Sequence, residues 1–155
     1  MPSTRLHSGF DAQAWSHRDG LIVDTRPADR YAHAHIRRSL CIPGNRSFCT
    51  WFGALIDYQS DTWLLVESEE EGARLVRELM HVGYDNVAGI SLADDAIEGL
   101  STEVVHQRSA ASLGGALGDP ALHILDVRSR SEFADGHIPG ARNIPLVELP
   151  RRLGE

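Results

Sequence analysis

Residues 21–43 read LIVDTRPADRYAHAHIRRSLCIP, and residues 123–145 read HILDVRSRSEFADGHIPGARNIP. The two stretches align without a gap at an offset of 102 residues, and eight of the 23 positions are identical: Ile22/Ile124, Asp24/Asp126, Arg26/Arg128, Ala32/Ala134, His35/His137, Ile36/Ile138, Ile42/Ile144 and Pro43/Pro145. This agreement indicates an internal repeat. A repeat of this kind is stronger evidence for a fold than the hydrophobic pattern of any single segment. The repeating unit is about one small domain long, and the chain holds one and a half of them.

Each copy of the repeat has the pattern of a buried strand followed by a polar turn. A short apolar run ends in Asp-x-Arg in both copies. Because residues two apart on a strand point to the same face, the carboxylate and the guanidinium can pair and brace the loop that follows. The second copy then has a Pro-Gly turn signal where the first has Arg37 and Arg38. The structural motif of the repeat comprises Asp24, Arg26, His35, Asp126, Arg128, His137, Pro139 and Gly140.

The second copy resembles the amino-terminal half of a rhodanese-like (sulfurtransferase) domain, through DVRSRSEFADGHIPGARNIP, and the first copy resembles a drifted version of it. The resemblance implies an α/β fold with a parallel sheet flanked by helices. It implies one complete, degenerate domain over residues 1–100 and the truncated start of a second over residues 101–155. In that family a nucleophilic cysteine opens a six-residue loop between the fourth strand and its helix.

Residues 61–90 carry the part of the first domain where that loop belongs. Residues 63–66 predict a strand, residues 69–81 an amphipathic helix, and residues 86–90 the next strand. The family's nucleophile position, 24 residues after Pro43, holds a glutamate, and no cysteine lies in this loop. The degenerate active-site loop comprises Glu67, Ser68, Glu69, Glu70, Glu71 and Gly72.

The shape expected for this loop also argues against sulfur transfer. A persulfide-forming thiolate needs backbone N–H groups aimed at it from a loop that turns before the helix begins. Ser68 and Glu71 instead predict a capping box, which starts the helix directly after the strand. The acids would repel an anionic sulfur donor and suit the helix dipole, so we assign them no catalytic role. The inward face of the helix is predicted to comprise Ala73, Val76, Leu79 and Met80.

Composition limits the partners of the chain. The formal net charge of −7, from 22 acidic and 15 basic residues, argues against nucleic acid and against an anionic membrane surface. No apolar run has the length of a spanning helix, and MPSTRLHSG at the start lacks the pattern of a secretion signal. Two cysteines do not make a disulfide framework. We expect a cytoplasmic protein with reduced thiols and no cofactor.

Other chemically capable side chains are weaker candidates. Cys41 and Cys49 are expected to be packing residues, because a buried thiol behaves as a small hydrophobe. His33 and His35 form H-x-H on a predicted polar turn but lack the acid and the third histidine of a metallo-hydrolase pattern, so no metal site is expected.

Two further segments are predicted from their patterns. Residues 3–7 read as an edge strand, which STEVVH at residues 101–106 repeats, and residues 10–18 read as a helix. A second helix is expected to bury one apolar face comprising Phe48, Trp51, Phe52, Leu55 and Ile56.

A finer resemblance concerns the parent protein. SFCTWFGALI, the acidic cysteine-free loop and LVRELMHVGYDNVAGI are similar to the degenerate first rhodanese module behind a metallo-β-lactamase-fold hydrolase, as in persulfide dioxygenase-like enzymes. The ligands of such a hydrolase are not in this chain, so its activity does not carry over. The nucleophile position of the second copy would fall near residue 169, after the end of this sequence at Glu155.

Three hypotheses remain open from the sequence. The chain is a non-catalytic module of a larger sulfur-metabolism protein, an active sulfurtransferase that uses a displaced cysteine, or a regulatory or oligomerisation module on a rhodanese scaffold. The half-unit has the apolar strands of a sheet interior, which should not lie exposed. We therefore expect other domains of a longer parent protein as partners, or a homodimer through residues 121–150.

Overall fold

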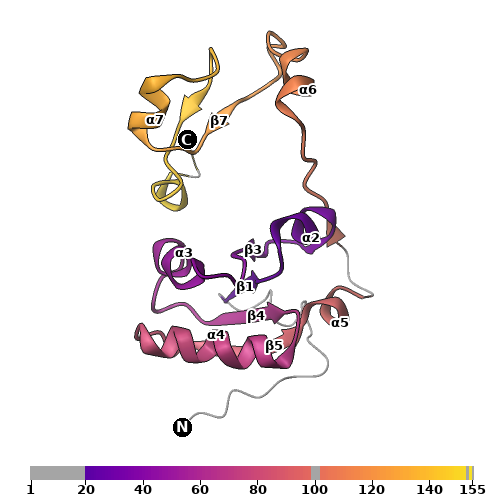
Figure 1. Ribbon diagram of the computed structural model, residues 1–155, viewed down its shortest axis with the longest axis vertical. Coiled ribbons are helices and arrows are strands. Elements are labelled where there is room, and N and C mark those ends of the chain that lie inside the picture. The colour runs from indigo at the N-terminus through magenta and orange to yellow at the C-terminus, as the bar shows by residue number, and fades with distance from the viewer. Residues whose placement is uncertain (1–19, 99–101, 153, 155) are drawn as a thin grey trace. The chain divides into compact units, whose positions relative to one another are not determined.

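The computed structural model describes residues 20–98, 102–152 and 154, and the chain divides after Gln107 into two compact units (Figure 1). The predicted edge strand at residues 3–7 and the predicted helix at residues 10–18 lie outside the described residues. No helix in the described part of the chain is long and apolar enough to cross a membrane.

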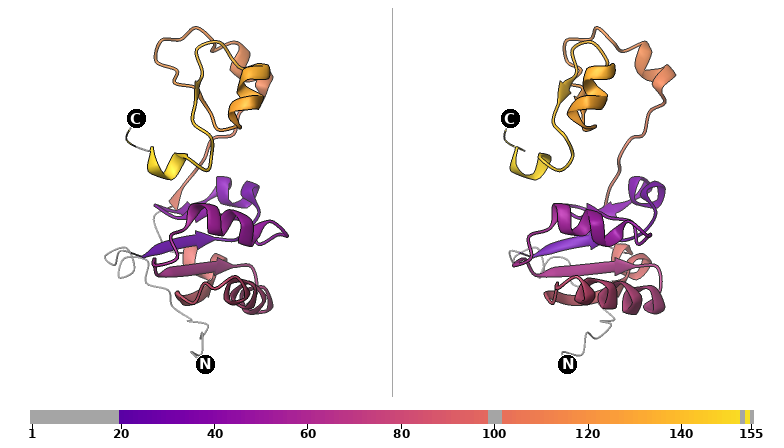
Figure 2. Two further views of the ribbon diagram at one scale, coloured as in Figure 1. Left: turned by 90° about the vertical axis from the view of Figure 1, so that its left-hand side faces the viewer. Right: turned by 60° about the vertical axis from the view of Figure 1, so that its left-hand side comes forward.

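The first unit is built on a parallel sheet of four strands in the order β3-β1-β4-β5, and the arrows of β1 and β4 point the same way in Figure 2. The strands are β1 (Leu21–Asp24), β3 (Leu40–Cys41), β4 (Thr62–Val66) and β5 (Val87–Leu92). The central strand β4 reads TWLLV and is almost wholly buried, as expected of a parallel strand covered on both faces. The predicted α/β class, a parallel sheet flanked by helices, is confirmed.

Helices cover both faces of this sheet. The larger core joins strand residues such as Val23 and Leu64 to α3 (Phe48–Leu55) and α4 (Glu69–His81), which runs alongside β4 in Figure 1. The opposite face joins Ile22 and Leu65 to α5 (Ala93–Ile97). A short helix, α2 (Ala28–His33), follows β1.

Helix α4 has the predicted bounds but a different buried face. Ala73 and Met80 are exposed, whereas the buried residues are Gly72, Leu75, Val76 and Leu79. The helix approaches β5 closely at Gly72, since a Cβ at this position would lie only 2.9 Å from the Ile90 side chain. This close approach buries Gly72. The helix ends at His81, two residues before Gly83, which takes a φ of +84° and allows the amides of residues 83 and 84 to bond to the last turn.

Helix α3 also buries a narrower face than its pattern predicts. Phe48, Phe52 and Ile56 are buried, Leu55 is half-buried, and Trp51 is 40% exposed. Phe52 meets Tyr84 edge to face at a centroid distance of 4.7 Å. The aromatic spacing therefore located the helix correctly but overestimated the width of its buried face.

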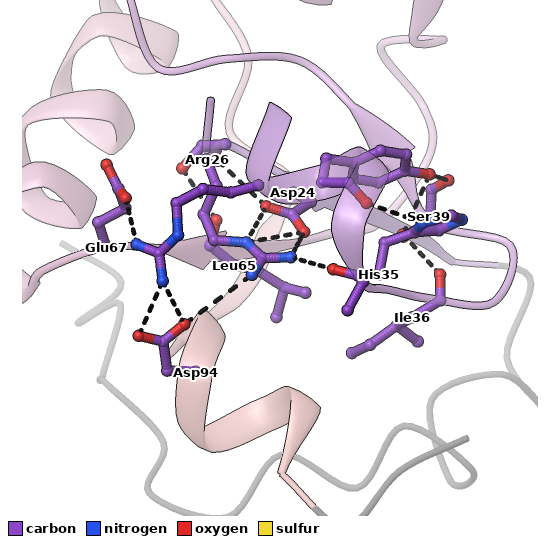
Figure 3. Close-up of polar contacts among 12 residues, drawn as sticks. Asp24, Arg26, His35, Ile36, Ser39, Leu65, Glu67 and Asp94 are labelled. Atoms are coloured by element: carbon purple, nitrogen blue, oxygen red, sulfur yellow. Dashed lines mark hydrogen bonds and ion pairs between the residues drawn. The ribbon is translucent and has the colours of Figure 1, made fainter. Parts of the chain in front are cut away.

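A buried ion pair braces the end of β1. The Arg26 guanidinium donates through Nε to Asp24 Oδ1 at 3.0 Å and through Nη2 to Asp24 Oδ2 at 2.7 Å (Figure 3). Arg26 Nη2 also donates to the Ala34 carbonyl at 2.8 Å, just after α2. Both side chains are almost completely buried. The pair therefore fixes the path of the chain from β1 through α2.

The second unit repeats this arrangement at the offset of 102 residues. Strand β7 (Leu125–Asp126) pairs in parallel with β8 (Arg142–Asn143), in the same register as β1 with β3. Arg128 binds Asp126 through the same atoms and also donates to the Gly136 carbonyl. The hydrogen bonds from the Arg128 side chain and backbone amide hold the pKa of the Asp126 carboxyl below its usual range. The remaining elements of this unit are α6 (Ala110–Gly114), α7 (Arg130–Asp135) and the 3-10 helix Leu149–Arg151. The internal repeat read from the sequence is thus a repeat of structure.

The histidine of each copy has a structural role. His35 lies buried in β2 (His35–Ile36), not on a polar turn, and its Nδ1 lies 3.0 Å from the Tyr31 carbonyl oxygen. His137 repeats the contact with the Phe133 carbonyl at 2.8 Å, and each imidazole stacks on the ring of that aromatic residue. These histidines hold the helix end to the strand that follows.

The turn after each histidine also corresponds in the two copies. In the second copy Pro139 and Gly140 form it, and Gly140 takes a φ of +84°. In the first copy Arg38 takes a φ of +64°, a conformation that glycine adopts more easily than arginine. The first copy therefore keeps the turn, although it has Arg38 where the second copy has Gly140.

The segment STEVVH provides strand β6 (Thr102–Glu103), which pairs antiparallel with β2 of the first unit. The Val105 amide also donates to the Ala32 carbonyl at 2.9 Å. The contacts of this segment therefore lie with the first compact unit.

We predict that Arg26→Ala lowers the free energy of unfolding of the first unit by about 3–5 kcal/mol, because Asp24 would remain buried without its counter-charge. All three tryptophans lie within residues 1–107, so tryptophan fluorescence in a urea titration reports this unit. Arg128→Ala is the matched control: it removes the same bonds from an exposed pair and should leave that transition unchanged. Equal urea midpoints for wild type and Arg26→Ala would contradict the assigned role of the buried pair.

Candidate functional site

One guanidinium joins the segments that follow β1, β4 and β5 at the carboxyl edge of the sheet. Arg30 of α2 donates through Nη1 to Glu67 Oε1 at 2.7 Å and through Nη2 to Asp94 Oδ1 at 2.9 Å. Figure 3 labels the two acceptors, Glu67 and Asp94. Asp94 also lies 3.9 Å from Arg26. The hydrogen bond to Glu67, followed by the hydrogen bond and charge of Asp94, raises the pKa of the Arg30 guanidinium above its usual range. The edge is thereby closed by side chains that neutralise one another.

The loop between β4 and α4 is filled by its own carboxylate. Ser68 caps the helix, and its Oγ accepts from the Glu71 amide at 3.2 Å. The Glu71 side chain turns back, and its Oε2 accepts from the Glu67 amide at 2.9 Å. The predicted capping box is therefore shifted, since the reciprocal bond goes to residue 67 instead of residue 68. The Glu67 amide, the first of this loop, is therefore already bonded to a carboxylate.

A hollow of about 420 Å³ lies beside this loop. It is lined by Thr25, Pro27, Ala28, Pro43, Gly44, Asn45, Glu67 and Glu71. A Cβ on Gly44 would lie 2.5 Å from Glu71 Oε1, so the carboxylate is seated directly against that glycine. Arg74 donates to the Gly44 carbonyl at 2.7 Å and lies 3.8 Å from Glu71. The carboxylate is thus held from two sides.

The chemistry available at this edge is limited by its residue types. A carboxylate at position 67 is a weak nucleophile compared with a thiolate, and it is held in an ion pair with Arg30. Of the remaining loop residues, Glu69 and Glu70 lie in the exposed first turn of α4, and Gly72 packs against Ile90. The arrangement can bind a cationic side chain, as it does with Arg30, but offers an anion a repulsive carboxylate.

Neither cysteine reaches this loop. Cys41 lies in β3, and burial together with the Asp24 carboxylate raises the pKa of its thiol to about 11. Cys49 lies in α3, and burial raises the pKa of its thiol as well. Both are half-buried free thiols, and Cys49 packs against the core. Each thiol is therefore far less ionised at neutral pH than an activated cysteine would be.

The structure brings together some predicted residues and separates others. Asp24, Arg26, Glu67 and Glu71 lie near one another at the carboxyl edge, whereas His35 packs on Tyr31. No group of three or more potential metal-binding side chains occurs among the residues that the structure describes. Sequence reasoning did not identify Arg30, because its partners are 37 and 64 residues away and no local pattern announces such a pairing.

Three known proteins illustrate what the chain is similar to. It is 36% identical over 94 residues to the HTH-type transcriptional regulator Rv0324 of Mycobacterium tuberculosis, a match that covers 56% of this chain and 37% of the regulator. The chain thus spans little more than a third of that relative. In structure it is similar to the Alr3790 protein from Anabaena, with 19% identity, a TM-score of 0.53, and coverage of 68% of this chain and 92% of that one.

A similar fold occurs in the anaerobic ergothioneine biosynthesis enzyme from Chlorobium limicola, with 18% identity and a TM-score of 0.52, over 90% of this chain and 41% of that one. At such identities the two structural likenesses concern the fold alone. The rhodanese-like domain model matches in two segments, residues 6–91 and 109–155. Because these segments make up most of the sequence, the chain belongs to the rhodanese-like domain family.

Proposed function

We propose that this chain is a non-catalytic rhodanese-like module of a larger sulfur-metabolism protein, in which residues 1–100 form a degenerate domain and residues 101–155 begin a second. The observation that carries the proposal is the bond from the Glu67 amide to the Glu71 carboxylate. The position that opens the loop holds an acid, and an amide that could face a bound anion faces a carboxylate instead. The module would therefore contribute binding or docking surface and leave sulfur chemistry to other domains.

The partners in this proposal are the other domains of the parent protein. A metallo-β-lactamase-fold hydrolase of the persulfide dioxygenase-like type is the parent that the sequence resemblance suggests. We propose that the module binds neither nucleic acid nor an anionic membrane surface, on the basis of the net charge of −7. A cytoplasmic location is proposed because its two cysteines are free and do not form a disulfide framework. No cofactor is part of the proposal.

A second candidate is a regulatory module on a rhodanese scaffold. The likeness to a transcriptional regulator favours it, since 36% identity extends over 94 residues. The two candidates share an inert loop and differ only in the parent protein. The full reading frame that contains this sequence distinguishes them: a hydrolase or sulfurtransferase domain supports the first, and a helix-turn-helix domain supports the second.

The alternative of an active sulfurtransferase with a displaced cysteine would require a reactive thiol. A pKa of about 11 leaves about one Cys41 thiol in a thousand ionised at pH 8. Cys49 lies on α3, which precedes β4 and does not form the loop after it. These features weigh against either thiol as a carrier of sulfur.

We predict that the protein produces no thiocyanate from thiosulfate and cyanide, and that Glu67→Cys alone does not restore turnover. The Glu71 carboxylate would lie beside the new thiol. Its negative charge would raise the pKa of that thiol and repel the anionic sulfur donor. Initial rates measured by the ferric thiocyanate colour test this, with circular dichroism to verify folding. Glu67→Cys combined with Glu71→Ala is the informative partner variant, because its thiol should titrate at lower pH than that of the single variant.

Two results of this assay would count against the proposal. Turnover by the unaltered chain that disappears in Cys41→Ser or Cys49→Ser would favour the displaced cysteine. Substantial turnover by the single Glu67→Cys variant would show that the loop can still bind a sulfur donor while Glu71 is present.

The thiols themselves provide a separate prediction. In a Cys49→Ser background, native Cys41 should react with iodoacetamide at pH 8 at least tenfold more slowly than the same thiol in urea, because burial and Asp24 disfavour the thiolate. The rate should rise with pH up to about 11. Mass spectrometry of timed samples follows the reaction, and equal rates in the native and unfolded protein would refute the assigned protection.

A further inference from the structure

The segment that leads into the second unit is held on the first unit by a short strand. Strand β6 pairs antiparallel with β2, and His35 lies directly opposite Glu103 in this pairing. The Val105 amide adds a bond to the Ala32 carbonyl at 2.9 Å. We call residues 102–105 the connecting strand. Because a two-stranded pairing of this length is marginal by itself, side-chain contacts matter for how firmly the connecting strand is held.

His35 brings a buried, titratable ring against the connecting strand. The residue is 6% exposed, and its Nδ1 lies 3.0 Å from the Tyr31 carbonyl oxygen. Since a carbonyl can only accept, Nδ1 carries the hydrogen, and Nε2 of the neutral ring has a lone pair. Nε2 lies 4.0 Å from Glu103 Oε2, beyond hydrogen-bond distance. In the neutral state two acceptors therefore lie near each other, whereas a proton on Nε2 would create an ion pair.

The Glu103 carboxylate is kept in this position by a second partner. Its Oε1 lies 3.2 Å from Arg37 Nε, while its Oε2 is the oxygen near His35. The Arg37 side chain is 76% exposed, so solvent screens its attraction to the carboxylate. The buried imidazole is screened less. Of the two contacts of this carboxylate, the one with the imidazole therefore depends on a proton that comes and goes between about pH 5 and 8.

Two other groups near the ring contribute no net charge. Arg26 donates to the Ala34 carbonyl, immediately before His35 in the chain, but its charge is balanced by Asp24 (Figure 3). The Tyr31 ring stacks on the imidazole at a centroid distance of 4.0 Å, and burial raises the pKa of its phenol, which stays neutral. Neither group offers the ring a counter-charge, so the proton-dependent contact is the one with the carboxylate of β6.

We propose that His35 makes the hold on the connecting strand depend on pH. A proton on Nε2 favours the paired state, because the imidazolium then lies beside the Glu103 carboxylate, and the neutral ring lacks this attraction. The pairing of β6 with β2 is therefore firmest below the titration range of the imidazole and weakens as the pH rises through it. Release would add residues 102–107 to the free segment that joins the two units. Such a device would operate whether or not the chain transfers sulfur.

Hydrogen exchange of the Val105 amide measures the hold on the connecting strand. Its protection factor should be about threefold higher at about pH 5.5 than at about pH 7.5, the effect expected of a partly exposed ion pair. The Ile42 amide, which donates to the Asp24 carbonyl within the sheet, is the reference, and its protection factor should stay constant. Equal protection of Val105 at the two pH values, or an equal change at both amides, would contradict the proposal.

Two variants assign the effect to the contact between His35 and Glu103. Glu103→Gln should remove the pH dependence at Val105, because a carboxamide carries no charge for the imidazolium to meet. The double variant His33→Gln, His106→Gln is the matched control: it removes the imidazoles at the end of α2 and just after the connecting strand, and it should keep the dependence. Dependence that persists in Glu103→Gln, or that disappears in the double variant, would overturn the proposal.

Discussion

The buried pair of Asp24 and Arg26 is the constraint on which the carboxyl edge of the first unit depends. It binds the end of β1 to the carbonyl of Ala34, and so fixes helix α2 above the sheet. Helix α2 carries Arg30, whose guanidinium reaches Glu67 after β4 and Asp94 in the first turn of α5. Removing two charges from water is costly, so the pair is better understood as a device that sets geometry than as a source of net stability. The repeat retains the same device at Asp126 and Arg128, where it is more exposed.

Two features of the loop between β4 and α4 both disfavour the binding of an anionic sulfur donor. An acid stands at Glu67, where the family resemblance places a nucleophilic cysteine, and a second acid at Glu71 occupies the amide that begins the loop. Each carboxylate has its own cation, Arg30 for the first and Arg74 for the second. The edge is therefore electrostatically satisfied without any ligand, which supports the proposal that the module is non-catalytic.

The sequence predicted the parts of this fold that follow from local pattern or from the repeat. The repeat predicted that the two copies correspond, and the structure bears this out in the matching registers of β1 with β3 and of β7 with β8. The strand predicted at residues 63–66 and the helix predicted at residues 69–81 follow from their apolar patterns. The exposed side of α4 was predicted less well, because Gly72 lets the helix approach β5 and turns Ala73 and Met80 outward. The partners of Arg30 could not be predicted, since long-range ion pairs leave no local pattern.

The claim that the loop is already filled can be tested at a single backbone group. The amide resonance of Glu67 in a two-dimensional nitrogen–proton spectrum reports directly on the bond to the Glu71 carboxylate. During a titration with thiosulfate at constant ionic strength, the account predicts that this resonance does not move. A saturable shift of the Glu67 amide would contradict it, because the anion would then have displaced the carboxylate and the loop would still be able to bind a sulfur donor.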